Sequence, residues 1–191
     1  MRDYPVRSFN EFMLLEKHLD TPRLTLRNLK EEDVQSNYLK WLVDPEVNRF
    51  LEVRFEKNQS LEKIRGFVKS INDSKNDLLL GLFEREGGCH IGNIRLGPCV
   101  KEHARSPIGY LIGEKKYWGK GYATEAIQRV VRYGFESLGL EKVTAGCYEN
   151  NLGSSKALEK CGFTLEARMP RSVIFDNQRI ASLMFGIDQP L

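Results

Sequence analysis

The part of the sequence that most restricts the fold is a glycine-rich connection between an apolar run and a long amphipathic segment. The run at 108–112 predicts a strand, and the connection ends in Gly119-Lys-Gly121. At 122–138 apolar residues recur at helical spacing, and Gly139 is typical of a helix end. Glycines at such a junction let successive backbone N–H groups and the helix N-terminus approach an anion closely. The sequence therefore predicts a strand–loop–helix unit that binds phosphate, with positive charge added by Lys115, Lys116 and Lys120.

Three kinds of phosphate loop compete for this stretch. A Walker A loop needs four residues before its Gly-Lys-(Ser/Thr), but five separate Gly113 from Gly119, and Gly121 replaces the hydroxyl residue. A dinucleotide-binding fingerprint would need a third glycine where Thr124 stands. A coenzyme A loop of the form (Arg/Gln)-x-x-Gly-x-(Gly/Ala) fits 116–121 with one departure, a lysine at its first position. The spacing favours the coenzyme A loop, and a plain turn with solvated lysines is the alternative to all three.

The rest of the chain predicts a mixed α/β domain. Strands are expected at 23–29, 78–83, 90–96, 108–112, 142–148, 163–168 and 180–187, with a hairpin turn at 84–88. Helices are expected at 31–43, 60–71, 122–138 and 154–160. Residues 1–20 are expected to form an N-terminal extension, as a short helix or arm, before one domain at 21–188.

Composition narrows the class of protein further. The 191 residues carry a net charge of +3, with 41% hydrophobic and 29% charged residues, which suits a folded domain rather than disorder. No apolar run reaches the ~18 residues of a membrane span and no secretory signal is present, so a cytoplasmic protein without membrane contact is expected. The 4 cysteines form no CxxC pair and the 3 histidines are scattered, so no metal site is expected. No stripe of aromatic and basic residues points to a nucleic-acid partner.

Two further stretches give the glycine loop a family context. The run 108–112 followed by Tyr117-Trp-Gly-Lys-Gly-Tyr-Ala-Thr-Glu-Ala126 resembles the acetyl-CoA-binding motif of the GNAT N-acetyltransferase superfamily. Asn151-Leu-Gly-Ser-Ser-Lys-Ala-Leu-Glu-Lys-Cys-Gly-Phe163 resembles the second signature of that superfamily. Thr21-Pro-Arg-Leu-Thr-Leu-Arg27 resembles the opening strand of the branch related to ribosomal-protein-alanine acetyltransferases. The resemblance spans roughly 20–188 and implies an acetyl-CoA-dependent N-acetyltransferase.

The resemblance also implies an architecture. A single GNAT-like domain has a mixed, mostly antiparallel central sheet that is flanked by helices and splayed at its middle, here between 108–112 and 142–148. The pantetheine arm would lie in that split and use backbone groups of Leu111 and Gly113, and a backbone N–H near Leu111 would polarise the thioester carbonyl. The cofactor positions carried over from the two signatures are Leu111, Ile112, Gly113, Lys116, Tyr117, Trp118, Gly119, Lys120, Gly121, Tyr122, Ala123, Asn151, Ser154 and Lys156.

The residue that assists the leaving thiolate departs from the family pattern. Many family members carry a tyrosine on the short helix, four residues before its glycine, but this sequence has Leu158 there. The serine used by the related branch matches Ser154, which makes Ser154 the candidate acid, and capping of the helix is its alternative role. Cys147 and Cys161 are expected to be packing residues rather than nucleophiles.

The general base is left open by the sequence. Glu52 lies after the first helix, where such enzymes enclose the amine, and it is a candidate base or amine ligand. Tyr148, at the end of a strand beside the split, and a relayed water are the alternatives, while Glu114 is expected to face solvent. Arg49 and Arg54 are candidates for binding an anionic group of the substrate, or else solvated charges.

The acceptor amine is not identified by any motif. The candidate acceptors are a peptide or protein N-terminus, an amino sugar and a small amine. The resemblance also implies that the chain could form a homodimer. The alternative to an enzyme is a non-catalytic module that senses acyl-CoA, because the usual tyrosine is missing and the base is undecided.

Overall fold

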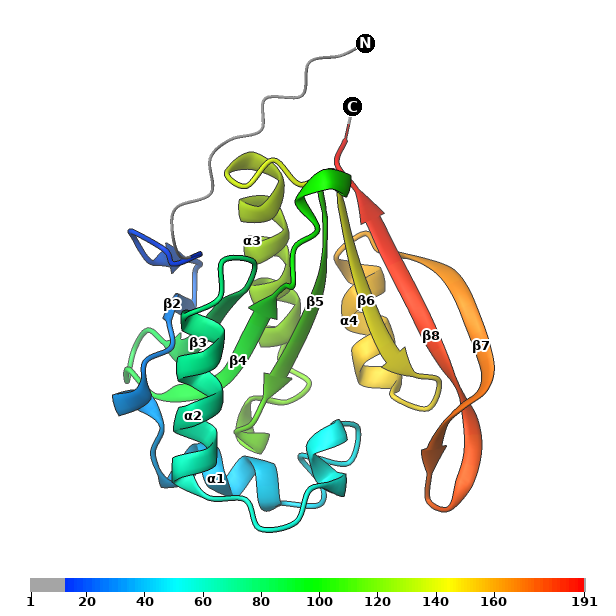
Figure 1. Cartoon of the computed structure of the whole chain (residues 1–191), viewed down its shortest axis with the longest axis horizontal. Coiled ribbons are helices and arrows are strands. Elements are labelled where there is room, and N and C mark those ends of the chain that lie inside the picture. Colours follow the sequence, from blue (N-terminus) through cyan, green and yellow to red (C-terminus); the bar gives the residue numbers. More distant parts are fainter. Residues whose placement is uncertain (1–12, 191) are drawn as a thin grey trace.

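A single eight-stranded sheet forms the centre of the structure, a computed structural model that describes residues 13–190. The strand order is β1-β2-β3-β4-β5-β6-β8-β7, and every neighbouring pair is antiparallel except β5 and β6 (Figure 1). The strands are β1 (Leu19–Asp20), β2 (Leu24–Asn28), β3 (Leu78–Glu84), β4 (His90–Leu96), β5 (Arg105–Ile112), β6 (Lys142–Tyr148), β7 (Thr164–Phe175) and β8 (Gln178–Asp188). The predicted mixed, mostly antiparallel sheet is confirmed.

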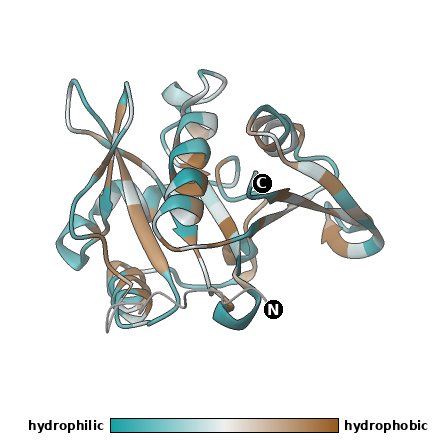
Figure 2. Ribbon diagram, turned by 90° about the horizontal axis from the view of Figure 1, so that it is seen from above, coloured by the Kyte–Doolittle hydropathy of each residue, from teal (hydrophilic) through white to brown (hydrophobic). Residues whose placement is uncertain are grey.

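Helices cover both faces of the sheet. On one face lie α1 (Ser36–Val43) and α2 (Leu61–Asn72), and on the other lie α3 (Tyr122–Glu136) and α4 (Leu152–Lys160). In β3, Leu78 and Leu80 join the core that contains α3, whereas Leu79 joins the core of α1 and α2. Figure 2 shows hydrophobic segments concentrated where helices and sheet meet. Short 3-10 turns lie at η1 (Glu31–Asp33), η2 (Glu52–Phe55), η3 (Lys101–His103) and η4 (Lys115–Tyr117).

The sheet is split between β5 and β6. The two strands pair only at residues 105–107 and 142–144, and within the described chain no pairing follows toward their carboxyl ends (Figure 1). β5 stays paired with β4 as far as Ile112, and β6 stays paired with β8 as far as Tyr148. Because β5 continues along β4 and β6 continues along β8, the twist of the sheet separates the carboxyl ends of β5 and β6. The predicted splay is confirmed at the predicted strands.

Several predicted boundaries shift. The helix expected at 31–43 is divided into η1 and α1, because Val34 between them is extended and fully buried. The strand expected at 108–112 begins three residues earlier, at Arg105, and the helix expected to reach 138 ends at Glu136. The closing strands extend well beyond 163–168 and 180–187 as an exposed hairpin. It turns at Asp176 and Asn177, whose φ angles of 48° and 61° suit a tight turn.

The N-terminal segment joins the core. Residues 1–12 of the predicted extension lie outside the described residues, and 13–18 are not helical. Met13, Leu15 and Leu19 are nevertheless buried, and β1 pairs with β2. Within residues 13–190, no helix combines the length and apolarity needed to cross a membrane.

Candidate active site

The glycine loop lies at the start of α3. Gly119 and Gly121 have φ angles of +70° and +82°, which residues with a side chain rarely adopt. A Cβ on Gly119 would meet nothing within 4 Å, and one on Gly121 would approach only Arg23 Nη2, at 3.6 Å. The glycines therefore leave open space in front of the first N–H groups of α3, which begins at Tyr122. Open space beside helix N-terminal donors suits a phosphate group.

An ion pair that the sequence analysis missed braces this loop. Arg23 donates from Nε to Glu125 Oε2 at 2.7 Å and from Nη1 to Lys120 O at 2.9 Å. Glu125 also accepts from Thr21 Oγ1 at 2.6 Å and from the backbone N–H of Arg23 at 2.8 Å. The Arg23 guanidinium lies over the Tyr122 ring, 4.1 Å from its centroid. The chain entering β2 therefore holds the loop and the first turn of α3 together.

We expect Glu125→Gln to lower stability in a pH-dependent way. Burial alone would raise the pKa of Glu125, but hydrogen bonds from Thr21 and Arg23 hold that pKa below its usual value. Such a carboxylate stabilises the fold above its unfolded pKa of about 4.3, and the contribution is lost as the pH falls through the folded pKa. The variant should cost about 1–3 kcal/mol at neutral pH and less below about pH 4. Calorimetry at both pH values measures this loss of stability, with Glu136→Gln at the exposed end of α3 as the control. A loss of stability in Glu125→Gln that does not change with pH would contradict the prediction.

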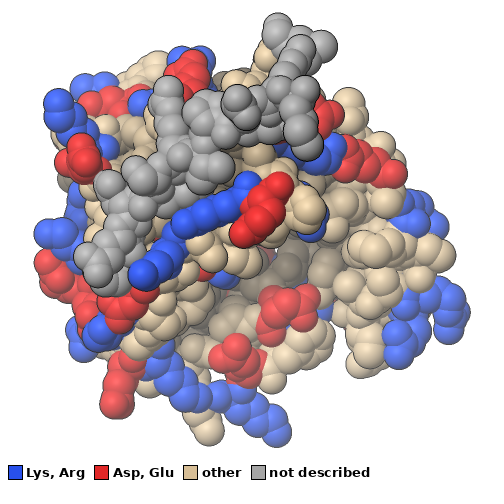
Figure 3. Space-filling view, turned by 45° about the horizontal axis from the view of Figure 1, so that its top comes forward, with Lys and Arg blue, Asp and Glu red and all other residues tan. Residues whose placement is uncertain are grey.

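The lysines around the loop differ in their surroundings. Lys115 Nζ lies 2.8 Å from Glu46 Oε2 and 2.9 Å from Asp44 Oδ2, and these two carboxylates raise the pKa of Lys115 to about 12. Lys115 is therefore paired with two carboxylates in this structure, and its contribution of charge to a phosphate stays a prediction. Lys116 and Lys120 are exposed beside the glycines. On the face that Figure 3 shows, basic and acidic side chains are interspersed over the described residues, so this face has no extended area of one charge.

The register of β5 decides which of its backbone groups face the split. Gly97 N donates to Pro107 O at 2.9 Å, and Gly113 N donates to Ile91 O at 2.8 Å. Because the direction of backbone groups alternates along a strand, the odd-numbered residues of β5 point theirs at β4. The even-numbered residues point theirs at the gap left by β6.

This alternation corrects one prediction. The N–H of Gly113 is already bonded within the sheet, and Leu111 directs its backbone groups to β4. The groups that face the gap belong instead to Tyr110 and Ile112, one residue earlier in each case. Ile112 O accepts a hydrogen bond from Trp118 Nε1 at 2.7 Å, which ties the loop to the end of β5.

Gly113 has a packing role. A Cβ at this position would fall inside the indole ring of Trp41, which α1 places against the end of β5. Trp41 Nε1 in turn donates to Glu114 Oε1 at 2.9 Å. The carboxylate of Glu114 is therefore directed at α1, and the expectation that it faces solvent is wrong.

The opposite wall of the split is α4. Asn151 Oδ1 accepts from Ser154 N at 3.2 Å, so Asn151, and not Ser154, caps this helix. The Ser154 hydroxyl is instead 2.7 Å from the hydroxyl of Tyr110, which reaches across from β5. Burial raises the pKa of Tyr110, so its phenol stays protonated and can donate. Tyr110 was not among the residues predicted from the sequence, although its even-numbered place on β5 directs its side chain at α4.

The other candidates on and near α4 have simpler surroundings. Leu158, at the place of the usual tyrosine, is fully buried in the core. Cys147 is buried with its Sγ 3.4 Å from Ser155 Oγ. Burial raises the pKa of Cys161 to about 11, which disfavours a nucleophilic thiolate. Lys156 is exposed on the helix surface.

The candidates for proton acceptance meet across the mouth of the split. Tyr148, at the end of β6, donates to Glu52 Oε1 at 2.5 Å, and Arg54 Nη2 donates to the Tyr148 hydroxyl at 3.0 Å. Burial, and then the hydrogen bond to Glu52, raise the pKa of Tyr148. Three residues that were proposed separately from the sequence therefore form one hydrogen-bonded group. Glu52 is exposed, so the carboxylate is reachable from the split.

An aromatic cluster fixes this group in place. Phe50 stacks on Phe175 of β7 with centroids 5.2 Å apart, and Tyr148 meets both rings edge-on. Arg49 lies over Phe50 and Phe175, at 4.8 and 5.2 Å, and Arg54 also donates to Ile174 O at 2.8 Å. Both arginines therefore have packing partners, and η2 is joined to the β7–β8 hairpin across the split.

Two other predicted cofactor residues lie at the glycine loop. Tyr117 packs edge-on against Tyr122 with ring centroids 5.1 Å apart, and Ala123 lies in the first turn of α3.

Comparison with known proteins points to one family. Residues 23–164 match the acetyltransferase (GNAT) domain. YoaA of Bacillus subtilis, an uncharacterized N-acetyltransferase, is 32% identical over 83% of this chain and 89% of its own. A GNAT acetyltransferase from Bacillus anthracis has a similar structure, with a TM-score of 0.77 and 23% identity over 90% of this chain and 98% of its own. A spermidine N-acetyltransferase from Vibrio cholerae, solved with CoA and spermine, gives a TM-score of 0.78 and 19% identity over 88% and 97% of the two chains.

Proposed function

The chain belongs to the GNAT acetyltransferase family and is an N-acetyltransferase, and we propose that it transfers the acetyl group of acetyl-CoA directly to a primary amine while both substrates are bound. The observation that carries this proposal is the split beyond residue 107, where backbone groups of β5 face a gap that leads to the glycine loop. The CoA in the Vibrio cholerae structure supports the same donor.

Binding of the donor is assigned to the loop and to β5. In the proposal, backbone N–H groups at Gly119 and Gly121 hold the pyrophosphate, and Lys116 and Lys120 add positive charge. The backbone of Tyr110 takes the role of an added strand partner for the pantetheine arm and polarises the thioester carbonyl. Acetyl-CoA supplies an activated acetyl thioester, and the chain positions it.

Proton handling is assigned to two groups on opposite sides of the split. As the amine nitrogen bonds to the carbonyl carbon, the C–S bond breaks, so nitrogen must lose a proton and sulfur leaves as a thiolate. Glu52, with its partner Tyr148, receives the proton from nitrogen. Ser154, held by Tyr110, donates a hydrogen bond to the leaving sulfur. An alkylammonium with a pKa of about 10.4 is almost wholly protonated at neutral pH and depends on this base more than an α-amine does.

The experiment that tests the proposal combines binding and turnover. Acetyl-CoA should raise the melting temperature, and thiol release measured with an Ellman-type reagent should require both acetyl-CoA and a primary amine. Stabilisation by CoA with no release on any amine would identify an acyl-CoA sensor instead. Stabilisation by ATP and not by CoA would contradict the assignment of the loop.

We expect Ser154→Ala to lower kcat by about 10- to 100-fold with little change in acetyl-CoA affinity. The reason is that its hydroxyl is assigned to the leaving sulfur, where a single aligned donor has an effect of this size or larger. Tyr110→Phe should cause a similar loss, and the double variant should lose little more than either alone, because the two hydroxyls act as one unit.

Ser155→Ala is the matched control for this prediction. Ser155 is the next residue of α4, and its hydroxyl contacts Cys147 and Asn151 O rather than Tyr110. Its kcat should stay close to the wild-type value. An unchanged kcat in Ser154→Ala would remove Ser154 from the reaction.

A further inference from the structure

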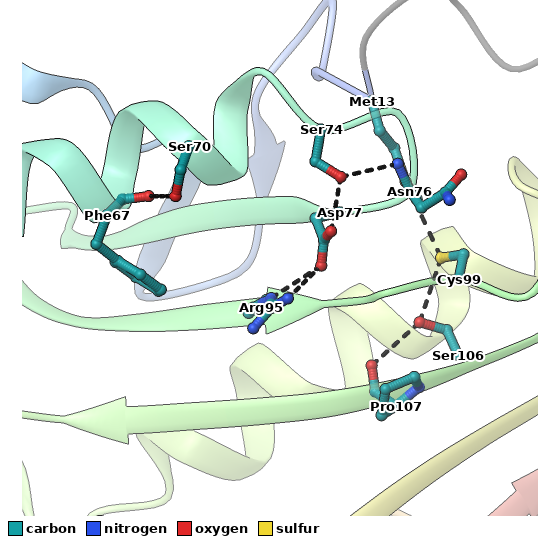
Figure 4. Close-up of polar contacts among 10 residues, drawn as sticks. All are labelled: Met13, Phe67, Ser70, Ser74, Asn76, Asp77, Arg95, Cys99, Ser106 and Pro107. Atoms are coloured by element: carbon teal, nitrogen blue, oxygen red, sulfur yellow. Dashed lines mark hydrogen bonds and ion pairs between the residues drawn. The ribbon is translucent and has the colours of Figure 1, made fainter. Parts of the chain in front are cut away.

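A cavity lies on the opposite face of β5 from α4. It has a volume of about 400 Å³, is partly open to solvent and is lined by α1, η2, α2 and the central strands β3 to β5. Apolar side chains from these elements dominate its wall: Leu42, Leu51, Val53, Ile64, Phe67 and Leu79. In Figure 4 the ring of Phe67 points from α2 toward the sheet. A cavity with this lining favours an apolar occupant.

The cavity meets the split at β5. Gly109, Tyr110 and Leu111 line it, and Tyr110 also carries the hydroxyl that reaches Ser154. A Cβ on Gly109 would meet nothing within 4 Å, so no neighbour closes the space at this point of the strand. A group in the cavity would therefore lie directly across β5 from the proposed donor site.

The same short turn serves both the cavity and the candidate base. Within η2 and the residue before it, Leu51 and Val53 line the cavity, whereas Glu52 and Arg54 contact Tyr148. An amine whose body occupies the cavity would approach η2, the turn that carries the proposed base.

The charged groups on the cavity wall, Arg95, Glu56 and Lys63, already have partners, and Lys63 Nζ donates to Lys57 O at 3.3 Å. Arg95 donates from Nε and Nη2 to Asp77 Oδ1 at 2.9 and 2.6 Å (Figure 4). Among the lining residues, Glu56 is the one carboxylate, and it accepts from Gln59 Nε2 at 2.9 Å. A polyamine would need several carboxylates for its ammonium groups, and an amino sugar would need a partner for each hydroxyl. The wall offers one carboxylate, and its other polar side chains, among them Gln59, Lys63 and Asn93, expose less surface to the cavity than the apolar ones do.

We propose that the cavity binds the apolar substituent of the acceptor, so that the substrate is a primary amine attached to an aliphatic or aromatic group. The inference rests on the proposed acetyl transfer and adds the substrate class to it. It distinguishes this chain from an enzyme for polyamines or amino sugars, although its fold is shared with a spermidine N-acetyltransferase.

A series of n-alkylamines from methylamine to hexylamine tests the proposal. The amine pKa is nearly constant along the series, so the rate reports the burial of methylene groups. The value of kcat/KM should rise about fourfold for each added methylene until the cavity is filled. Spermidine and glucosamine should react no faster than methylamine.

A matched pair of variants locates the effect. Val53→Asn places an amide on the cavity wall, and because Val53 lies outside both core clusters, the fold should be retained. The preference for hexylamine over methylamine should fall about tenfold, because an amide covered by the bound alkyl chain would lose water without gaining a partner. Val43→Asn makes the same change at a residue that is 55% exposed and does not line the cavity, and the preference should be kept.

The outcomes separate this inference from the proposed function. Turnover of spermidine or glucosamine with no rise along the alkyl series would overturn the substrate class and leave acetyl transfer intact. A rise that follows the length of the acyl chain on CoA, and not that of the amine, would assign the cavity to the donor and equally overturn it. No thiol release on any amine would mean that the proposed function itself had failed.

Discussion

Replacing Gly121 by valine should weaken acetyl-CoA binding by about 100-fold or more, measured by titration calorimetry, while leaving the chain folded. Two effects act together. At a φ angle of +82° a β-branched residue is strained by at least about 1–2 kcal/mol, so the loop would change its backbone conformation. The added side chain would also extend into the open space before α3, where the pyrophosphate is expected.

Gly139→Val is the control that isolates the second effect. Gly139 has a φ angle of +67°, and a Cβ there would meet nothing within 4 Å, so its backbone strain is comparable. It follows the other end of α3, about 20 Å from the glycine loop along the helix. The control should lose a similar amount of thermal stability and keep its affinity for acetyl-CoA. Equal affinities in the two variants would show that the loop does not bind the cofactor.

The parts of the site that were predictable from sequence depend on local chemistry. Strand β6 and the start of α3 follow from apolar periodicity and from the glycines, which act over a few neighbouring residues. From the sequence, capping of α4 was considered only as the alternative role of Ser154, although Asn151 is an equally good capping residue. The structure assigns the cap to Asn151, and this leaves the Ser154 hydroxyl for Tyr110.

The parts that were not predictable depend on contacts between distant segments. Arg23 and Glu125 are 102 positions apart, and Tyr148 is 96 positions from Glu52. No local pattern marks such pairs, and mixed charges near a helix end are usually solvated. The direction of backbone groups on β5 also depends on its pairing with β4. Sequence alone therefore chose Leu111 and Gly113 as the residues whose backbone faces the gap, whereas the pairing of β5 with β4 leaves Tyr110 and Ile112 facing it.

Replacing Glu52 by glutamine should lower kcat by about 100-fold or more for an alkylamine, with acetyl-CoA affinity retained. The amide keeps the size of the side chain and can still pair with Tyr148, but it cannot accept the proton that nitrogen must lose. The deficit should shrink as the pH approaches the pKa of the amine, because free amine is then abundant and the enzyme no longer has to remove a proton from the ammonium before the attack. A purely structural role for Glu52 would predict a deficit that does not respond to pH.

Two further variants divide the role between Glu52 and its partner. Tyr148→Phe removes the phenol but leaves the carboxylate, so a loss of only about tenfold would identify Glu52 as the acceptor and Tyr148 as a positioning residue. A loss as large as that of Glu52→Gln would indicate that the proton passes through the phenol. Glu62→Gln, an exposed carboxylate in the first turn of α2, should leave kcat unchanged. If Glu52→Gln matches this control at every pH, the amine loses its proton to water and the hydrogen-bonded group at the mouth of the split serves only to hold η2 against β6.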